Sequence, residues 1–286
     1  MTRQVRTVND ADQVILARPT QDGDGVNIHR IAGGHLNALL DPFLLIDEIR
    51  SDDASDYVGG FPEHPHRGFQ TLTYMLEGGF KHRDSIGNEG SVRDGGLQWL
   101  SAARGVLHSE MPLPRNGRLH GYQFWINLPA QYKMESPAYR DIQAEEIPYL
   151  RDAQGTVYRQ LLGGIELDDN TRLEAALNLP RNKVAMTDVA LSASGQARLR
   201  IPAGFVMQVL VVSGYWGGYG EKHLLHFAAM GEESVLQIDI AEAAKLIVFG
   251  GHPLKEPIAQ YGPFVMNTRE EIEQAMRDYR DGVLSP

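Results

Sequence analysis

The sequence predicts an all-β protein made of two similar β-barrels in tandem, with a short helix close to the C-terminus. Short apolar runs alternate with turn signals at intervals of about 8–12 residues, which is typical of β-sandwiches and β-barrels. A pattern in the first half recurs in the second half, and only one segment has clear helical periodicity. Apolar residues make up 42% of the 286 residues, which is enough for a substantial core.

The strand patterns are clearest in the first half of the chain. Residues 70–76 (QTLTYML) are rich in β-branched and aromatic side chains and end close to Gly78. Residues 84–90 (DSIGNEG) have the composition of a turn, and residues 97–100 and 122–128 again have strand patterns. This succession of strands and turns favours a sheet-rich fold over a helical one.

A helix is predicted for residues 270–279. Thr268 and Glu271 form the pattern of a capping box, which satisfies free backbone N–H groups where a helix begins. Apolar side chains then follow the spacing of one helix face, at Ile272, Ala275, Met276 and Tyr279.

An internal repeat predicts the domain organisation. Residues 66–78 can be aligned with residues 202–214, because both contain Gly-Phe, then an apolar strand, then Gly at the same spacing. We therefore predict one domain in residues 1–135 and a second in residues 136–286. The polar, proline-containing residues 133–147 have the composition of a linker between them.

Two short strings carry the chemistry of the first half. They are HPH at residues 64–66 and HSE at residues 108–110. In an extended strand, residues i and i+2 point to the same face, so each string projects two metal-ligand side chains in one direction. His64, His66, His108 and Glu110 would together give three imidazoles and one carboxylate, which suit Fe, Mn, Co, Ni, Cu or Zn. The alternative is a set of hydrogen-bonded histidines at the end of a sheet.

The second half lacks these ligands. In the repeat alignment, the positions of His64 and His66 hold Arg200 and Pro202. We therefore expect a metal site in the first barrel alone.

Strand parity also makes predictions for neighbours of the histidines. Gln70 has the parity of His64 and His66, so it is expected to face the same cavity, where it either hydrogen-bonds a metal-bound water or fills space. Phe69 and Thr73 have the opposite parity and are expected to pack elsewhere.

Three further predictions concern side chains around this site. His82 and Asp84 alternate before a turn, so a structural hydrogen bond is expected there, and replacing His82 should leave the metal content unchanged. Trp99, Phe124 and Trp125 are expected in the core rather than as a platform for substrate.

Composition excludes several classes of function. The formal net charge of −10 argues against direct binding to nucleic acid, which needs a basic surface. The absence of cysteine excludes disulfides and thiolate ligands. Residues 1–25 lack the apolar segment of a leader peptide, and no apolar stretch reaches the roughly 18 residues needed to span a bilayer. We expect a cytoplasmic protein that does not bind membranes.

The chain resembles the pirin family of the cupin superfamily over nearly its whole length. The resemblance rests on residues 41–48, 64–69, 82–85, 97–99, 104–112, 125–129, 256–259 and 261–268. It implies two cupin barrels, each a double-stranded β-helix or jelly roll, with one metal in the N-terminal barrel. It also implies four metal ligands, at His64, His66, His108 and Glu110. One divalent transition metal is expected per chain, with Fe(II) as the first choice and Mn, Co, Ni, Cu or Zn as alternatives.

The resemblance implies two functions. Some bacterial members resemble quercetinases, which use O2 to open flavonols with loss of carbon monoxide. This predicts a small planar phenolic substrate, with Glu110 as proton acceptor and Gln70 or a water as relay. Eukaryotic members resemble iron-dependent, redox-sensitive transcription cofactors, which predicts a protein partner instead. Family members commonly have Glu where this chain has Gln70, which bears on catalytic efficiency rather than on metal binding. A monomer is expected in either case.

Overall fold

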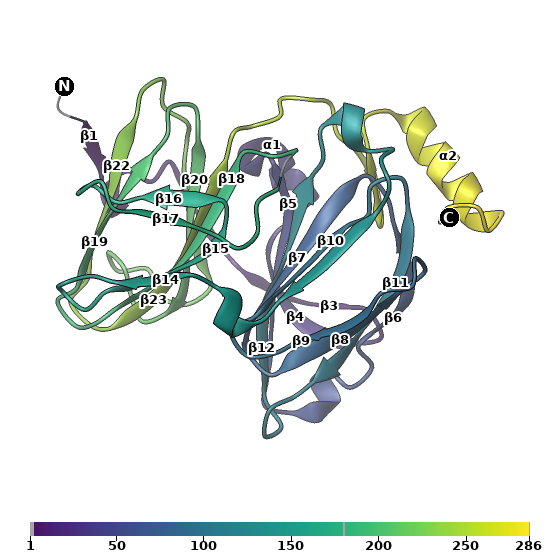
Figure 1. The fold of residues 1–286 in the computed structure, drawn as a ribbon, viewed down its shortest axis with the longest axis horizontal. Coiled ribbons are helices and arrows are strands. Elements are labelled where there is room, and N and C mark those ends of the chain that lie inside the picture. The colour runs from purple at the N-terminus through teal and green to yellow at the C-terminus, as the bar shows by residue number, and fades with distance from the viewer. Residues whose placement is uncertain (1–2, 180, 286) are drawn as a thin grey trace. The chain divides into compact units, whose positions relative to one another are not determined.

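The computed structural model describes residues 3–179 and 181–285, which form mostly β-sheet as the sequence predicts (Figure 1). The chain divides into two compact units. The first-barrel unit consists of residues 18–144 and 254–286, and the second-barrel unit consists of residues 1–17 and 145–253. Among the described residues, no helix is both long and apolar enough to cross a membrane.

The first-barrel unit has two main antiparallel sheets and a small hairpin. The seven-stranded sheet has the order β13 (Ala138–Ile142), β10 (Leu97–Ser101), β7 (Phe69–Glu77), β12 (Leu119–Asn127), β5 (Phe43–Ser51), β4 (Val26–Ala32) and β3 (Arg18–Asp22). The four-stranded sheet has the order β6 (Phe61–His66), β11 (Val106–Leu113), β8 (Gly79–Asp84) and β9 (Glu89–Val92). The hairpin is formed by β24 (Ala259–Tyr261) and β25 (Phe264–Met266).

The second-barrel unit has a similar plan. Its seven-stranded sheet has the order β14 (Tyr149–Arg151), β15 (Val157–Leu162), β18 (Val184–Leu191), β23 (Ala244–Gly251), β20 (Val206–Ser213), β21 (His223–Phe227) and β2 (Gln13–Leu16). Its three-stranded sheet has the order β1 (Gln4–Arg6), β22 (Ser234–Asp239) and β19 (Gln196–Ile201). A separate hairpin is formed by β16 (Gly164–Glu166) and β17 (Arg172–Glu174).

Each unit has its own apolar core. Val26, Met75 and Phe80 belong to a buried cluster of the first-barrel unit, and Leu225 and Leu246 belong to one in the second-barrel unit. Alternate residues of each strand enter these cores, because side chains of a strand point to opposite faces. Removing this apolar surface from water is the main force that holds each barrel together.

Helix α2 (Arg269–Arg280) confirms the prediction for residues 270–279, and the short α1 (Asn37–Leu40) was not predicted. The capping box is present, since the Thr268 hydroxyl accepts from the Glu271 N–H and the Glu271 carboxylate accepts from the Thr268 N–H. Ile272 and Ala275 are buried against Phe264 and its neighbours. Two residues of the predicted apolar face, Ile272 and Ala275, therefore attach the helix to the first-barrel unit, whereas Met276 and Tyr279 are exposed.

The compact units differ from the predicted contiguous domains, residues 1–135 and 136–286. Strand β2 pairs with β21, so the N-terminal segment extends the large sheet of the second-barrel unit. The predicted linker at residues 133–147 contains strand β13, which pairs with β10. β13 is an edge strand with mostly half-exposed side chains, and its sequence is therefore as polar as that of a linker.

The internal repeat has a structural counterpart in two glycine turns. Gly68 lies between β6 and β7 with φ +89°, and Gly204 lies between β19 and β20 with φ +77°. A left-handed backbone of this kind favours glycine. A Cβ atom at Gly68 would also lie 1.9 Å from the carbonyl oxygen of Val265, so no larger side chain fits there.

A buried lysine holds this first turn in place. Lys133 is 1% exposed, and its Nζ donates hydrogen bonds to the Gly68 carbonyl (2.6 Å), the Asn127 side chain (2.5 Å) and the Val265 carbonyl (3.0 Å). One side chain thus connects the turn between β6 and β7 with the end of β12 and with β25.

Replacing Lys133 by Met should destabilise the protein, because it leaves these buried acceptors unpaired. We expect the free energy of unfolding to fall by about 3 kcal/mol or more, measured by urea unfolding with circular dichroism. The control is Lys81→Met on β8, where the side chain is exposed and the change should stay within about 0.5 kcal/mol. Equal unfolding midpoints for the two variants would contradict the proposed role of Lys133.

Stability should also depend on pH through this lysine. Burial lowers the pKa of Lys133 to about 7 from its ordinary 10.5, while Glu256 and Glu271 oppose the shift. Between these values the unfolded chain binds more protons than the folded chain, so the folded state gains stability as pH rises. We expect the urea midpoint to increase from about pH 7 to about pH 9 and to do so less in Lys133→Met. A wild-type midpoint that falls over this range would show that the ammonium form is retained.

Candidate metal centre

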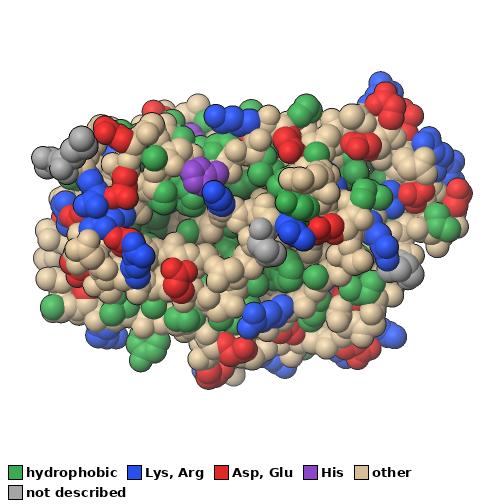
Figure 2. All heavy atoms as spheres, turned by 45° about the horizontal axis from the view of Figure 1, so that its top comes forward, with side chains coloured by type: hydrophobic (Ala, Val, Ile, Leu, Met, Phe, Trp, Pro, Cys, Tyr) green, Lys and Arg blue, Asp and Glu red, His purple; other side chains and the backbone are tan. Residues whose placement is uncertain are grey.

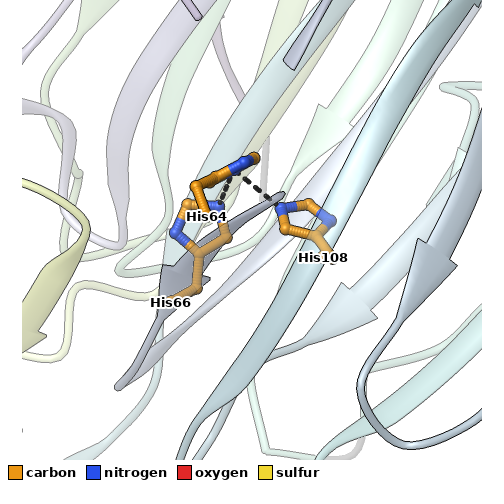
Figure 3. Close-up of side chains that lie close together, drawn as sticks. All are labelled: His64, His66 and His108. Carbon is orange, nitrogen blue, oxygen red and sulfur yellow. Dashed lines mark hydrogen bonds between the residues drawn. The ribbon is translucent and has the colours of Figure 1, made fainter. Parts of the chain in front are cut away.

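The structure brings three of the four predicted ligands together. Strands β6 and β11 pair antiparallel, with His108 directly opposite His64. The Nε2 atom of His64 lies 3.0 Å from Nε2 of His66 and 3.0 Å from Nε2 of His108 (Figure 3). Among the residues that the structure describes, these are the three whose ligand atoms gather within 4.8 Å of one another.

The hydrogen bonds of His64 fix which of its nitrogens carries the proton. Nδ1 of His64 lies 2.8 Å from the carbonyl oxygen of Pro62. A carbonyl can only accept, so Nδ1 donates, and in the neutral ring Nε2 therefore presents a lone pair.

His108 is oriented by a chain of two further side chains. Nε2 of His82 lies 3.1 Å from Oδ2 of Asp84 and donates to this carboxylate, so Nδ1 of His82 is left as an acceptor. Nδ1 of His108 lies 3.5 Å from Nδ1 of His82 and points its N–H at it. The Nε2 atom of His108 then presents a lone pair, as Nε2 of His64 does. The predicted hydrogen bond between His82 and Asp84 is confirmed, and it orients a histidine of the cluster.

This donor set fits a divalent metal ion. Two lone pairs that face each other at 3.0 Å repel unless a cation lies between them. Imidazole nitrogens bound at about 2.1 Å and at right angles around one ion are themselves about 3.0 Å apart. Burial lowers the pKa of His66 and of His108 well below 6.5, with smaller contributions from the neighbouring histidines. The imidazoles of His66 and His108 are therefore neutral at pH 7, which is the form that binds metal.

The centre combines buried and accessible parts. His66 and His108 are buried, whereas His64 is only half-buried. The ring of His66 contacts Phe69 at 4.9 Å and Trp125 at 5.3 Å, measured between ring centroids. These two aromatic side chains form an apolar wall beside the three imidazoles.

Glu110 lies outside the three-residue cluster. The pairing of β11 with β6 shifts register between His108 and Glu110, which is a β-bulge or a similar irregularity. The Glu110 carboxylate is buried and accepts hydrogen bonds from Nε2 of Gln123 (2.9 Å) and from the Thr73 hydroxyl (3.4 Å). Its role as a fourth ligand remains a prediction.

The predicted position of Gln70 is wrong. Phe69 contacts His66, and Thr73 donates to Glu110, so residues of this parity on β7 face the site. Gln70 has the other parity, and its Oε1 accepts a hydrogen bond from Nε1 of Trp99 at 3.0 Å. The turn at Gly68 separates β6 from β7 and interrupts the alternation, so parity cannot be counted from the histidines to Gln70.

Sequence reasoning missed Gln123 and Trp125 as parts of the site. Both have the same parity on β12, and in register they lie opposite Thr73 and Thr71. The indole Nε1 of Trp125 is buried and has no hydrogen-bond partner among the described residues. The sequence contained no signal for either, because their place follows from the pairing of β12 with β7.

Comparison with known proteins identifies the family of this chain. The pirin family pattern matches residues 25–126, and the pattern of the pirin C-terminal cupin domain matches residues 186–285. A Pseudomonas aeruginosa protein provisionally named quercetin 2,3-dioxygenase is 42% identical over 280 residues, covering 96% of this chain and 98% of that protein. The chain belongs to the pirin family.

Two further proteins that are similar to this pirin carry different names. Human pirin is 36% identical over 275 residues, covering 93% of this chain and 91% of its own length. The crystal structure of quercetin 2,3-dioxygenase from Acinetobacter baumannii superposes with a TM-score of 0.85 at 30% identity, covering 96% of this pirin and 98% of that chain. The predicted fold of two cupin domains is thereby confirmed.

The sequence predicted that replacing His82 would leave the metal content unchanged. Because His82 orients His108, we now expect a different result. His82→Ala removes the acceptor for Nδ1–H of His108, so we expect metal affinity to fall roughly 10- to 100-fold. The affinity can be measured by competition between the protein and a chelator for Co(II) or Zn(II). His120→Ala is the matched control, because His120 hydrogen-bonds Glu48 rather than a histidine of the cluster. Unchanged affinity in a folded His82→Ala variant would contradict this role.

Proposed function

We propose that this pirin is a metal-dependent dioxygenase that opens flavonols of the quercetin type. The observation that carries the proposal is the convergence of three imidazole nitrogens from β6 and β11. The Pseudomonas aeruginosa and Acinetobacter baumannii relatives, whose names include quercetin 2,3-dioxygenase, support the substrate class.

His64, His66 and His108 would hold the metal, with Glu110 as the predicted fourth ligand and iron(II) as the expected ion. When bound, a divalent metal supplies Lewis acidity that lowers the pKa of a phenolic hydroxyl, and a redox-active metal also supports reaction with O2. The donor set of imidazole and carboxylate suits such ions.

Glu110 is proposed as the proton acceptor for the substrate hydroxyl. Its carboxylate is buried, and the donors of Gln123 and Thr73 hold it in one orientation. A general base held in place in this way contributes roughly 10²- to 10⁴-fold to a rate. The relay through Gln70 that the sequence suggested receives no support, because Oε1 of Gln70 accepts a hydrogen bond from Trp99.

Phe69 and Trp125 are proposed to hold the flat rings of the substrate. Their own rings lie 4.3 Å apart at 30°, and both contact His66. The apolar wall also excludes water from the reacting atoms.

Turnover of quercetin tests the proposal. Protein loaded separately with Fe, Mn, Co, Ni or Cu is incubated with quercetin under air while the flavonol absorption band is followed. We expect the band to disappear, with one O2 consumed and one carbon monoxide released for each flavonol opened. Glu110→Gln should lower kcat about 10²- to 10⁴-fold, and His35→Ala, which alters an exposed histidine, should not.

Two outcomes would count against a dioxygenase. One is the absence of turnover with every metal when elemental analysis shows that the metal is bound. The other is equal turnover in His66→Ala, which lacks one of the three imidazoles.

The second candidate function is a metal-dependent regulator that binds a protein partner. The relationship to human pirin favours it, as does the net charge of −10, which suits a basic partner. On the face shown in Figure 2, however, acidic and basic side chains are interspersed, and neither sign dominates. Partner binding that differs between Fe(II) and Fe(III) protein, without loss of quercetin, would favour this function over the first.

A further inference from the structure

A tyrosine on the edge strand β13 contacts the side chain that orients His108. Tyr139 reaches from the seven-stranded sheet to His82 on β8, which belongs to the four-stranded sheet. The two rings are stacked, with their centroids 4.3 Å apart and their planes at 17°. The ring of His82 also contacts that of His108, at 5.3 Å between centroids. His82 therefore connects Tyr139 with a candidate metal ligand.

The hydroxyl group of Tyr139 is held by two side chains. It accepts a hydrogen bond from Nε2 of Gln98 (3.1 Å), which also donates to Oδ1 of Asp141 (3.0 Å). The hydroxyl itself donates to the Asp141 carboxylate. Burial raises the pKa of Tyr139 above its ordinary 10, and the bond to Asp141 raises it further, so the hydroxyl keeps the proton that it donates. These bonds fix the end of the ring that points away from the backbone of β13.

Gly90 on β9 leaves room for this arrangement. It lies opposite His82 in the pairing of β8 with β9. A Cβ atom at residue 90 would overlap both the Asp141 carboxylate and the Tyr139 hydroxyl oxygen. The φ angle of Gly90 lies outside the left-handed region, so the backbone conformation does not call for glycine here. The close approach of Tyr139 does.

The carboxylate that binds His82 is also fixed. Oδ1 of Asp84 accepts from the backbone N–H groups of Ile86 (3.1 Å) and Asn88 (2.9 Å), and Oδ2 accepts from the Asn88 side chain (2.8 Å). Nε2 of His82 is thus bonded to a carboxylate that three other donors hold, while the face of its ring lies on Tyr139. The bond fixes one atom of the imidazole and the stacked ring fixes its plane, so both together determine where Nδ1 points.

The hydrogen bond between His82 and His108 depends on this plane. The two Nδ1 atoms are 3.5 Å apart, which is longer than most hydrogen bonds made by N–H groups. A small tilt of the His82 ring would therefore break the bond and leave Nδ1–H of His108 without its acceptor. Partners that orient metal-binding histidines commonly change metal affinity by 10- to 100-fold.

We propose that Tyr139 is a positioning residue of the metal centre, which holds the ring of His82 in the plane where it accepts from His108. This role depends on the candidate metal centre and not on the dioxygenase reaction proposed above. It gives β13, whose sequence has the composition of a linker, a part in metal binding.

Removal of the stacked ring tests this role. Tyr139→Leu keeps an apolar side chain but no flat ring, so the affinity for Co(II), measured by competition with a chelator, should fall roughly tenfold. The d–d absorption bands of bound Co(II) should change as well, because His108 is no longer oriented. Tyr139→Phe keeps the ring and should bind Co(II) nearly as tightly as the wild type. Unchanged affinity and unchanged bands in folded Tyr139→Leu protein would overturn the proposal.

A double variant separates positioning from a general loss of stability. Tyr139 also packs beside Leu100 and Val106, so its removal should lower the unfolding midpoint whatever its role. If Tyr139 acts through His82, Tyr139→Leu should have no further effect on Co(II) affinity in His82→Ala protein. Reductions that multiply in the double variant would show that the tyrosine does not act through His82, and would overturn the proposal.

Tyr158→Leu is the matched control. Tyr158 is buried in the second-barrel unit, and its hydroxyl also donates to an aspartate, Asp152 (3.2 Å). Its replacement should lower stability and leave the Co(II) affinity unchanged, and an effect as large as that of Tyr139→Leu would contradict the proposal. Should Tyr139→Leu fail to fold, Gly90→Ala gives a second test. Its methyl group displaces the Tyr139 hydroxyl, so Co(II) should again bind more weakly, and wild-type affinity would overturn the proposal.

Discussion

The pairing of β6 with β11 is the constraint on which the candidate metal centre depends. His64 and His108 lie opposite each other in this pair, and His66 follows on the same face. A slip of one residue would turn one of these side chains to the other face of the sheet. The backbone hydrogen bonds of two neighbouring strands therefore determine whether three imidazoles meet at one point or remain dispersed.

The side chains around strands β6 and β11 determine which nitrogens of the imidazoles present lone pairs. Pro62 and His82 each take one N–H from the cluster, which leaves the lone pairs of His64 and His108 directed at each other. Arrangements of this kind are costly without a cation, and proteins keep them where a ligand compensates.

Sequence patterns of neighbouring residues predicted much of this structure. The predictions were wrong at a sharp turn of the chain and where residues far apart in the sequence contact each other. The two alternating strings and the capping box at Thr268 depend on neighbouring residues, and the structure contains both the histidine cluster and the helix. Gln70 was misplaced because the turn at Gly68 resets the alternation of side chains. Lys133 was assigned to a linker although it is buried, since two of its three acceptors, the carbonyls of Gly68 and Val265, come from distant parts of the chain. Edge strands such as β13 are polar, so composition alone cannot distinguish them from connecting segments.

The discontinuous first-barrel unit has a consequence for protein synthesis. The chain next to the histidine string is bonded to a segment made almost two hundred residues later, because the backbone of Arg67 pairs with Pro263 and Val265, and its guanidinium pairs with Asp278. A ribosome releases the histidines long before it releases these partners. The contacts of Arg67 beside the candidate metal centre can therefore form only after the ribosome has synthesised the segment that follows the second barrel. A chain that ends before Pro263 lacks all of these contacts.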